Sequence, residues 1–239
     1  MIIGINGYAG SGKDTVGTII QYLQADTNIP LKGVLNKTPH HIWWLEERSG
    51  WEIKKWAGKL KDIASLLTGI PVESFEDQEF KKTLLGPEWG TVTLNPLNSI
   101  PVFSDIQFNS LMSVREFLQK LGTDAIRDGL HTNAWVNALM AGYTPTKVQW
   151  ADGPIGGYKD GPMPNWIITD TRFPNEAQAI KDKGGIVIRV DRPGVKPIND
   201  HPSEVGLDHW NFDYKIANVS DLKALTGTVE MILLKENLL

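Results

Sequence analysis

The chain contains no cysteine among its 239 residues, which excludes a disulfide framework and any thiolate metal site. It also has no surplus of basic residues, because 24 Lys and Arg stand against 28 Asp and Glu and the net charge is −4. We therefore expect no duplex nucleic acid as a partner, and any polyanion has to be held by a local cluster of cations. No apolar run approaches the roughly 20 residues that span a bilayer, and the N-terminal residues lack the basic region of a secretion signal. The five histidines have no metal-ligand spacing. These absences predict a soluble intracellular protein with no membrane partner.

Short apolar segments alternate with helical patterns along the chain, whose length fits one domain with insertions. The segments predicted as strands are Ile2–Asn6, Trp51–Ala57, Trp166–Thr169, Ile186–Val190 and Tyr214–Val219. The segments predicted as helices are Lys13–Ala25, Gly58–Leu67, Ser113–Leu121, Thr132–Ala141, Asn175–Lys183 and Ser220–Lys235. This alternation predicts an α/β fold with a doubly wound parallel sheet.

Three stretches rich in Pro, Gly and Asn do not fit the alternation. They are Asn28–Gly50, Leu84–Asn109 and Thr144–Asn165, and we expect each to be a loop or an insertion. The third is expected to hold the least regular structure.

The segment that joins the first predicted strand to the first predicted helix is rich in glycine. It reads Gly7-Tyr8-Ala9-Gly10-Ser11-Gly12-Lys13-Asp14-Thr15 and matches G-x-x-x-x-G-K, with Asp where Ser or Thr is usual. Backbone N–H groups of such a loop and the N-terminus of the following helix bind phosphate, and Lys13 adds a mobile charge. The motif predicts a nucleoside triphosphate site at Gly7, Gly10, Ser11, Gly12, Lys13, Asp14 and Thr15. The plain alternative is a glycine-rich turn with a surface lysine.

The sequence has no N-K-x-D motif and no strand that ends in Asp-Glu after a long apolar run, which argues against a GTPase and a motor ATPase. The Asp in GKDT is a departure that we associate with phosphotransferases acting on small phosphorylated acceptors. A magnesium ion is expected near Asp14 or Thr15.

The predicted helix that begins at Ser113 carries Arg115 and Gln119 on one face, one turn apart. A guanidinium can hold a monophosphate by two hydrogen bonds, and a carboxamide can bond to the edge of a base. This face is a candidate acceptor site, with Asp124 and Arg127 further along. The alternative is a solvated polar face.

Asp170 and Arg172 directly follow a predicted strand, at the sheet edge where ligands bind in open α/β sheets. Asp170 can hold the water shell of magnesium or contact the substrate, and Arg172 can neutralise the phosphoryl group in transfer. A structural Asp–Arg pair that caps the next helix is the alternative. Arg192 follows the next strand and lies at the base of a Pro/Gly loop that could close over the nucleotide. For His201 in this loop, a hydrogen bond at a helix start is as good an explanation as a ligand role.

The basic run Lys54–Lys61 is interleaved with Trp56. Lysine with tryptophan can indicate stacking on nucleic acid, but the spacing here fits a strand end followed by an amphipathic helix. Local phosphate contact, including one by Lys61, and plain surface remain the two alternatives.

Several motifs together resemble the phage-type deoxynucleoside monophosphate kinases, a family of P-loop kinases. They are GxxxxGKDT, AGKLKD, SVRxxxQxLGTD, TNAWVNAL, ITDTRFPNE, VxRPG and HPSExGL, and they run in order from Ile2 to about Leu222. The resemblance implies transfer of the ATP γ-phosphoryl group to a deoxynucleoside 5′-monophosphate with Mg²⁺. It also implies one kinase domain over residues 1–239, with an acceptor-binding helical region at about 58–143 and a lid-like segment at about 191–210.

The resemblance assigns roles to single residues. Arg115 and Gln119 resemble acceptor-binding residues, Arg172 a phosphate-neutralising arginine, Arg192 a lid-base residue, and Asn218 part of the loop on the adenine side. We expect Lys13, Arg172 and Arg192 to act on the transferred group, and the protein to lie in the cytoplasm, that of the host if a phage encodes it. A homodimer is left open. Two alternatives remain: a kinase for another small phosphorylated acceptor, and a nucleotide-binding accessory protein without catalysis.

Overall fold

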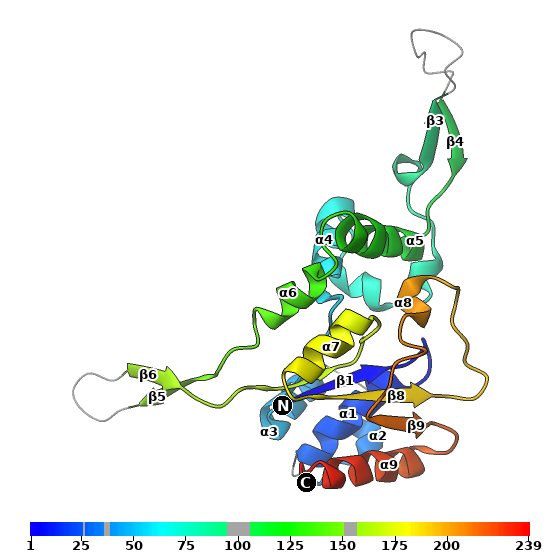
Figure 1. Ribbon diagram of the computed structural model, residues 1–239. Helices are drawn as coiled ribbons and strands as arrows, with labels where there is room; N and C mark the ends of the chain where they lie inside the picture. Colours follow the sequence, from blue (N-terminus) through cyan, green and yellow to red (C-terminus); the bar gives the residue numbers. More distant parts are fainter. Residues whose placement is uncertain (26, 36–38, 95–105, 151–156) are drawn as a thin grey trace. The chain divides into compact units, whose positions relative to one another are not determined.

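The computed structural model describes residues 1–25, 27–35, 39–94, 106–150 and 157–239 (Figure 1). The chain divides into two compact units. The sheet unit consists of Met1–Trp56 and Trp135–Leu239, and the helical unit consists of Ala57–Ala134. Each unit has a hydrophobic core of its own, so each is described by itself.

A five-stranded parallel sheet forms the centre of the sheet unit, in the order β2-β7-β1-β8-β9. Its strands are β1 (Ile2–Asn6), β2 (Trp51–Lys54), β7 (Asn165–Ile168), β8 (Ile186–Asp191) and β9 (Tyr214–Ala217). All five strands predicted from apolar segments are present, with ends that differ by a few residues. The predicted α/β fold with a parallel sheet is therefore confirmed.

Helices cover both faces of this sheet (Figure 1). On one face, α1 (Lys13–Gln24) and α9 (Leu222–Lys235) bury their apolar side chains against β1 and β8. On the other face, α7 (Pro174–Asp182) packs against β1 and β8. Residues of β1 alternate between the two cores, since Ile3 and Ile5 belong to the first and Ile2 to the second. This is the burial on both faces that a doubly wound sheet requires.

The strand order brings three functional segments to one edge of the sheet. β1 lies between β7 and β8, and all three strands run in the same direction. Their carboxyl ends are therefore neighbours, and the residues that follow them, Gly7, Thr169 and Arg192, begin loops at the same edge. In open α/β sheets this is where ligands bind.

The helical unit is built on α4 (Gly58–Thr68) and α5 (Val114–Gln119), which enclose a core that includes Ala64, Phe75 and Phe117. Three short 3₁₀ turns connect them, at Val72–Glu76, Phe80–Lys82 and Pro87–Trp89. After α5 the helix continues in wider π-helical turns over Lys120–Asp128. The predicted end at Leu121 is wrong, because the helix continues past it and Gly122 is buried inside the π-helical turns.

Expected loop Asn28–Gly50 instead contains two helices, α2 (Leu31–Val34) and α3 (Pro39–Ser49). Leu45 of α3 is buried with Val34 and Ala25 in a small core beside α1. The loop expectation failed because proline marked the segment as irregular. Pro39 is the first residue of α3, a position at which proline is favoured.

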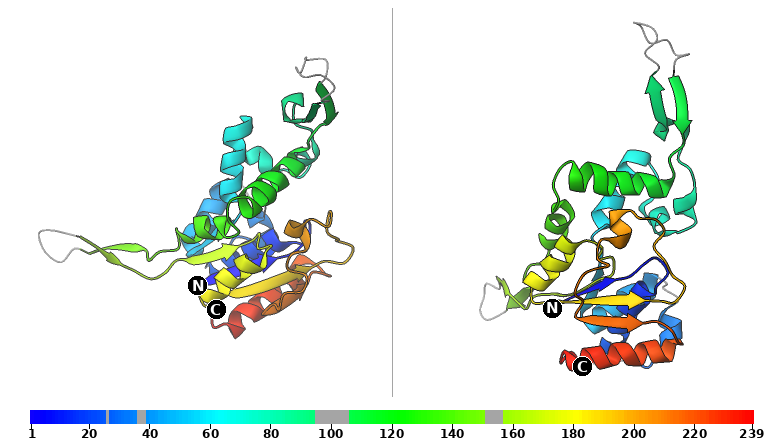
Figure 2. Two further views of the ribbon diagram at one scale, coloured as in Figure 1. Left: turned by 45° about the horizontal axis from the view of Figure 1, so that its top comes forward. Right: turned by 45° about the vertical axis from the view of Figure 1, so that its right-hand side comes forward.

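The other two expected loops contain antiparallel hairpins (Figure 2). In the helical unit β3 (Thr91–Leu94) pairs with β4 (Ile106–Ser110), and in the sheet unit β5 (Lys147–Trp150) pairs with β6 (Gly157–Asp160). Four- and five-residue strands are too short to show clear alternation beside many Pro, Gly and Asn residues. The stretch Thr144–Asn165, expected to hold the least regular structure of the three, contains β5, β6 and the first residue of β7 within its described residues. Residues 95–105 and 151–156 lie outside the described residues.

The predicted helix Thr132–Ala141 is present as α6 (Ala134–Met140), and one further short helix, α8 (Pro202–Val205), follows β8. Across the described ranges, no helix combines the length and the apolar character needed to cross a membrane.

Candidate nucleotide phosphate site

The loop between β1 and α1 has the backbone that the glycine motif predicts. Gly10 and Gly12 have φ values of 84° and 100°, in the left-handed region that favours glycine. Gly12 stands at the N-cap of α1, and within the described chain no side chain caps the first turn. The N–H groups of that turn are therefore left for an anion, which the N-terminus of α1 attracts.

Asn218, which follows β9, holds this loop from the side. Its Nδ2 donates a hydrogen bond to the carbonyl oxygen of Ser11 at 2.9 Å, and its backbone N–H donates to the carbonyl oxygen of Asp191 at 2.7 Å. A Cβ atom at Gly12 would lie 2.6 Å from Nδ2 of Asn218, so this close approach also requires glycine. The hydroxyl of Ser11 is buried and has no hydrogen-bond partner among the described residues, which leaves it for a phosphate oxygen or a water.

Lys13 is the first residue of α1, and its side chain is only 14% exposed. Burial lowers the pKa of its ammonium group, and the charges of Asp14 and Asp170 oppose this shift in part. Arg172 and Lys55 add to the lowering, so both of these cations are near Lys13. The phosphate loop is thus lined by positive charge that a bound anion would stabilise.

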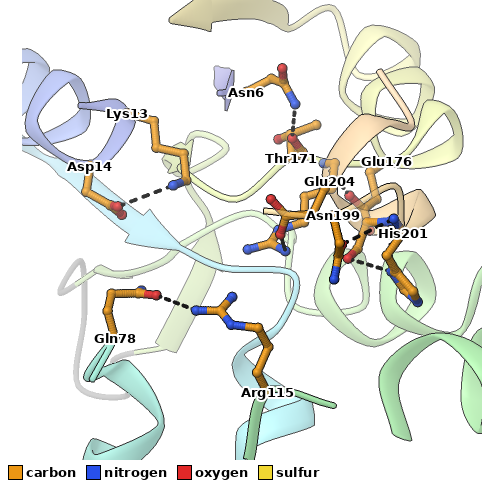
Figure 3. Close-up of polar contacts among 12 residues, drawn as sticks. Asn6, Lys13, Asp14, Gln78, Arg115, Thr171, Glu176, Asn199, His201 and Glu204 are labelled. Carbon is orange, nitrogen blue, oxygen red and sulfur yellow. Dashed lines mark hydrogen bonds and ion pairs between the residues drawn. The ribbon is translucent and has the colours of Figure 1, made fainter. Parts of the chain in front are cut away.

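Asp14 lies between cations and the end of β7. Its Oδ2 is 3.8 Å from Nζ of Lys13 (Figure 3). Its Oδ1 is 4.0 Å from Nζ of Lys55 and accepts a hydrogen bond from Oγ1 of Thr169 at 2.9 Å. The carboxylate is about half exposed and ties the first turn of α1 to β7 and the residue after β2.

A magnesium site at Asp14, Thr15 and Asp170 is compatible with the donor set. All three side chains offer oxygen, the ligand that Mg²⁺ prefers. Asp170 is buried and accepts a hydrogen bond from the backbone N–H of Trp56 at 2.8 Å, which fixes its carboxylate at the sheet edge. Two carboxylates and a hydroxyl are few protein ligands, and such a set suits Mg²⁺, which keeps several waters and also binds phosphate.

Arg172 lies in the loop between β7 and α7. Its Nη1 is 3.6 Å from Oε1 of Glu204, and its side chain is 42% exposed whereas that of Glu204 is 6% exposed. The helix after this loop is capped by Glu176, which accepts hydrogen bonds from the backbone N–H groups of Arg172 and Phe173 at 2.8 and 3.1 Å. The capping carboxylate of α7 is therefore Glu176.

Arg192 follows β8 and reaches the phosphate loop. Its Nη1 donates a long hydrogen bond of 3.5 Å to the carbonyl oxygen of Gly10. Further on, Nδ1 of His201 accepts a hydrogen bond from the backbone N–H of Ser203 at 3.2 Å, and His201 is the N-cap of α8. For His201 the structure thus shows the hydrogen bond at a helix start.

A second group of contacts fixes the phosphate loop at Tyr8. The hydroxyl of Tyr8 donates to both carboxylate oxygens of Asp208 at 2.8 Å, and the Arg189 guanidinium lies 4.4 Å from the centre of the Tyr8 ring. Arg189 is buried and also bonds to Asn6 and Asp191, with distances of 2.6 and 2.7 Å. This network connects the ends of β1 and β8 to the segment after α8.

The sequence did not indicate the roles of Lys55, Thr169, Tyr8, Asp208 and Glu204. Lys55 was within the basic run, and the order of β2 beside β7 would have placed it at the ligand edge. Tyr8, Thr169 and Glu204 lie within the motifs, but they bond to residues more than 30 positions away in the chain, so the motifs alone do not reveal these contacts.

The candidate acceptor residues belong to the helical unit. Nη2 of Arg115 donates a hydrogen bond to Oε1 of Gln78 at 3.0 Å (Figure 3), and Gln119 is half-buried one turn later on α5. Lys61 of α4 is buried and forms an ion pair with Glu76. Arg127 is buried and donates to the carbonyl oxygen of Thr132 at 3.3 Å, whereas Asp124 is exposed. Their roles in acceptor binding stay predictions.

The sheet order and the phosphate loop after its first strand define a P-loop nucleotide-binding fold. Comparison with protein families identifies the kind of P-loop protein. The model of the family described as deoxynucleotide monophosphate kinase matches residues 81–229. This match spans more than half of the chain, and the chain belongs to that family. The family, the fold and the kinase class predicted from the motifs are confirmed.

Curated viral proteins show the same relationship. The deoxynucleoside-5′-monophosphate kinase of Escherichia phage T5 is 27% identical over 248 aligned positions, which cover 92% of this chain and 90% of the phage protein. A protein of Acanthamoeba polyphaga mimivirus, provisionally given the same family name, is 36% identical over 100 residues, or 39% of this chain and 46% of that protein. The deoxynucleotide monophosphate kinase of Enterobacteria phage T4 is 32% identical over 118 residues, or 49% of this chain and 44% of that protein. The chain thus spans less than half of two of these relatives.

Proposed function

We propose that this chain transfers the γ-phosphoryl group of ATP to a deoxynucleoside 5′-monophosphate, giving ADP and a deoxynucleoside diphosphate. Membership of the kinase family supports the reaction. The single structural observation that carries this proposal is the buried Lys13 at the N-terminus of α1, next to a glycine-rich loop and with Arg172 and Lys55 close enough to lower its pKa.

The residues of the sheet unit provide alignment and charge in this reaction. An oxygen of the acceptor phosphate forms a bond to the γ-phosphorus while the bond from that phosphorus to the bridging β,γ-oxygen breaks, and ADP leaves. The acceptor oxygen is already an anion, so the protein needs to supply position and neutralisation rather than a general base. We assign Lys13 and the N–H groups of the loop to the β- and γ-phosphates, and Arg172 and Arg192 to the charge of the transferred group.

Magnesium is part of the proposal. When bound, it would reduce the negative charge of the phosphate groups. Asp14, Thr15 and Asp170 are the residues of this chain that would hold it, directly or through water. Asp14 remains close to two lysines, so its charge is balanced when the ion is absent.

The adenine side is assigned to the loop between β9 and α9. A pocket of about 130 Å³ lies there, lined by Ala217, Asn218, Val219, Ser220, Ala224, Leu225 and Thr228. Its wall combines aliphatic groups with the polar Asn218 and Ser220, which suits the face and the edge of a base. Because Asn218 also bonds to Ser11, this pocket adjoins the phosphate loop.

The acceptor monophosphate is assigned to the helical unit. The Arg115 guanidinium donates a hydrogen bond to the neutral side-chain amide of Gln78, and Gln119 lies on the same helix face four residues later. A phosphate dianion would compete well with the Gln78 amide for that guanidinium, since hydrogen bonds between charged groups are about twice as strong as neutral ones.

A screen of ADP release tests the function. The purified chain is incubated with ATP and Mg²⁺ and with each deoxy- and ribonucleoside monophosphate in turn, and ADP is measured by a coupled assay. We expect release that requires a deoxynucleoside monophosphate, and its ranking over the four bases gives the base preference. Lys13→Ala is the matched control for contaminating kinases.

Two other results would contradict the proposal. ATP binding without acceptor-dependent ADP release would indicate a nucleotide-binding accessory protein. Release only with other phosphorylated acceptors would indicate a kinase of different specificity. The oligomeric state and the predicted cytoplasmic location are separate questions and stay predictions.

A further inference from the structure

The second half of the segment His201–Asp208 is held against other parts of the sheet unit, through Glu204, Gly206, Leu207 and Asp208. His201 caps α8, Leu207 is fully buried in the core under α7, and Asp208 bonds to Tyr8 of the phosphate loop. At Gly206 an added Cβ would lie 2.9 Å from the carbonyl oxygen of Arg172, so the backbone of this segment lies directly on the backbone at Arg172. Residues 204–208 of the segment predicted to be lid-like are therefore anchored.

Glu204 is the first residue of this anchored segment and faces Arg172. Its side chain is 6% exposed, and its Oε1 is 3.6 Å from Nη1 of Arg172. A buried carboxylate loses its hydration and requires a compensating charge, and within the described part of the chain Arg172 is the cation beside it. The position of each charge therefore depends on the other.

The Arg172 guanidinium is well placed to act on phosphate. It is close enough to Lys13 to lower the pKa of that lysine, and its side chain is 42% exposed whereas Glu204 is buried. A guanidinium carries five N–H donors in one plane. Contact with Glu204 on one side leaves the donors on the other side for a ligand.

We propose that Glu204 is a positioning residue for Arg172: the buried carboxylate holds the guanidinium beside the phosphate loop, so that its free donors meet the phosphoryl group as it is transferred. This inference rests on the proposed kinase function. It assigns to the HPSE sequence at residues 201–204 a role in placing a cation rather than in contacting substrate.

The positioning role and a purely electrostatic role of Glu204 predict different changes in kcat when its charge is removed. If the carboxylate only opposed the bound phosphates, Glu204→Gln would strengthen ATP binding and leave turnover the same or higher. If it positions Arg172, the same variant lowers kcat because the guanidinium is no longer held where transfer needs it. KM for ATP then stays unchanged or falls, since one negative charge near the phosphates has gone.

The experiment is a double-mutant cycle on the full chain. kcat and the KM for ATP and for the preferred deoxynucleoside monophosphate are measured for the parent, Glu204→Gln, Arg172→Ala and the double variant. Glu230→Gln, an exposed carboxylate on α9, is the matched control. Displacement of an aligned group by about 1 Å can cost up to about a hundredfold, so we expect kcat of Glu204→Gln to fall about ten- to a hundredfold. In the Arg172→Ala background, Glu204→Gln should change kcat no further.

Glu204→Asp gives a second test if Glu204→Gln does not fold, which circular dichroism and the thermal midpoint would reveal. It keeps the charge but shortens the side chain by one methylene, and we expect an intermediate loss of kcat. An unchanged kcat in the folded variants, or a loss in the Arg172→Ala background as large as that in the parent, would overturn the inference. If the parent itself shows no acceptor-dependent ADP release, the proposed function has failed instead.

Discussion

The side-chain amide of Asn218 donates a hydrogen bond to the carbonyl oxygen of Ser11, and the same nitrogen occupies the space that a side chain at Gly12 would need. A residue just before α9 therefore fixes the turn that presents the backbone N–H groups of the phosphate loop. The conformation of the phosphate loop after β1 therefore depends on the residue that follows β9.

Replacing Asn218 with Ala should weaken ATP binding without affecting the acceptor. Loss of one hydrogen bond of about 1 kcal/mol corresponds to a rise of about fivefold in the KM for ATP. Initial rates over a range of each substrate check this, with the exposed Asn211→Ala as a control. An equal rise in the KM for the monophosphate would show instead that Asn218 stabilises the fold of the chain rather than the ATP site.

Binding of ATP at alkaline pH should take up protons through Lys13. Burial lowers the pKa of Lys13 below the ordinary lysine value of 10.5, so part of the unliganded chain has a neutral Lys13 when the pH is a little below that value. Phosphate charges favour the ammonium form and raise the pKa again. Calorimetric titration with ATP in buffers of different ionisation enthalpy should show uptake at about pH 9 and little at about pH 7.

The same lowered pKa has a consequence for the unliganded chain. Since the unfolded chain binds the Lys13 proton more tightly, the stability of the folded chain should increase as pH rises through the folded-state pKa of Lys13. Lys13→Ala should lose both this increase in stability and the uptake of protons on ATP binding, and its turnover should fall at least about a hundredfold.

The calorimetric titration can also contradict the assignment. If the measured enthalpy of ATP binding does not depend on the buffer at any pH, Lys13 is not near the phosphates.

Asp14→Asn should change how nucleotide binding depends on magnesium. The variant removes a negative charge 3.8 Å from Lys13 and 4.0 Å from Lys55, so both lysines attract metal-free ATP more strongly. It also removes a candidate magnesium ligand. We therefore expect tighter ATP binding in the presence of a chelator and a several-fold higher Mg²⁺ concentration for half-maximal turnover.

Two titrations on each protein, ATP affinity in chelator and rate against Mg²⁺, measure these effects. Asn keeps an oxygen that can accept the hydrogen bond of Thr169, so the fold of the loop should survive. Superimposable curves for Asp14→Asn and the parent would make Asp14 a structural link between α1 and β7, and Thr15 the better candidate for the metal.

Arg115→Ala should raise the KM for the monophosphate far more than the KM for ATP. Loss of a charge-assisted hydrogen bond corresponds to about ten- to a hundredfold. Arg115→Lys should recover only part of this, because a point charge cannot replace a two-pronged contact. Gln119→Ala should instead alter the ranking of the acceptor bases. Equal effects of Arg115→Ala on the two KM values would indicate that α5 is a structural helix.

The sequence predicted the parts of the fold whose chemistry is local. Strands such as Ile2–Asn6 are apolar throughout because both of their faces are buried, and the glycine spacing after β1 follows from the backbone turn around phosphate. Both properties are present in a few consecutive residues. They were enough to place Lys13 and the residues after β7 and β8 at one edge of the sheet.

Features that depend on distant residues could not be predicted. α3 is stabilised by burial of Leu45 beside α1, and the charge of Glu204 is compensated by a residue more than 30 positions earlier. Asp14 was expected to face phosphate, and only the structure shows its bond to Thr169 and its distance from Lys55. In each case the contacting residue is distant in the sequence, and only the tertiary fold brings the two residues together.

The two ends of the β5–β6 hairpin lie next to each other in the sheet unit. Thr146 and Pro162 face each other there, with the Thr146 backbone N–H and hydroxyl both donating to the Pro162 carbonyl oxygen at 3.0 Å. Because these two residues are already tied together, a tight turn could join them in place of everything between, and β7 would keep its register with β1. We therefore expect the fold of the sheet unit to tolerate insertion and deletion at this point. A fluorescent label or an affinity tag inserted here should leave the conformation of the phosphate loop unchanged.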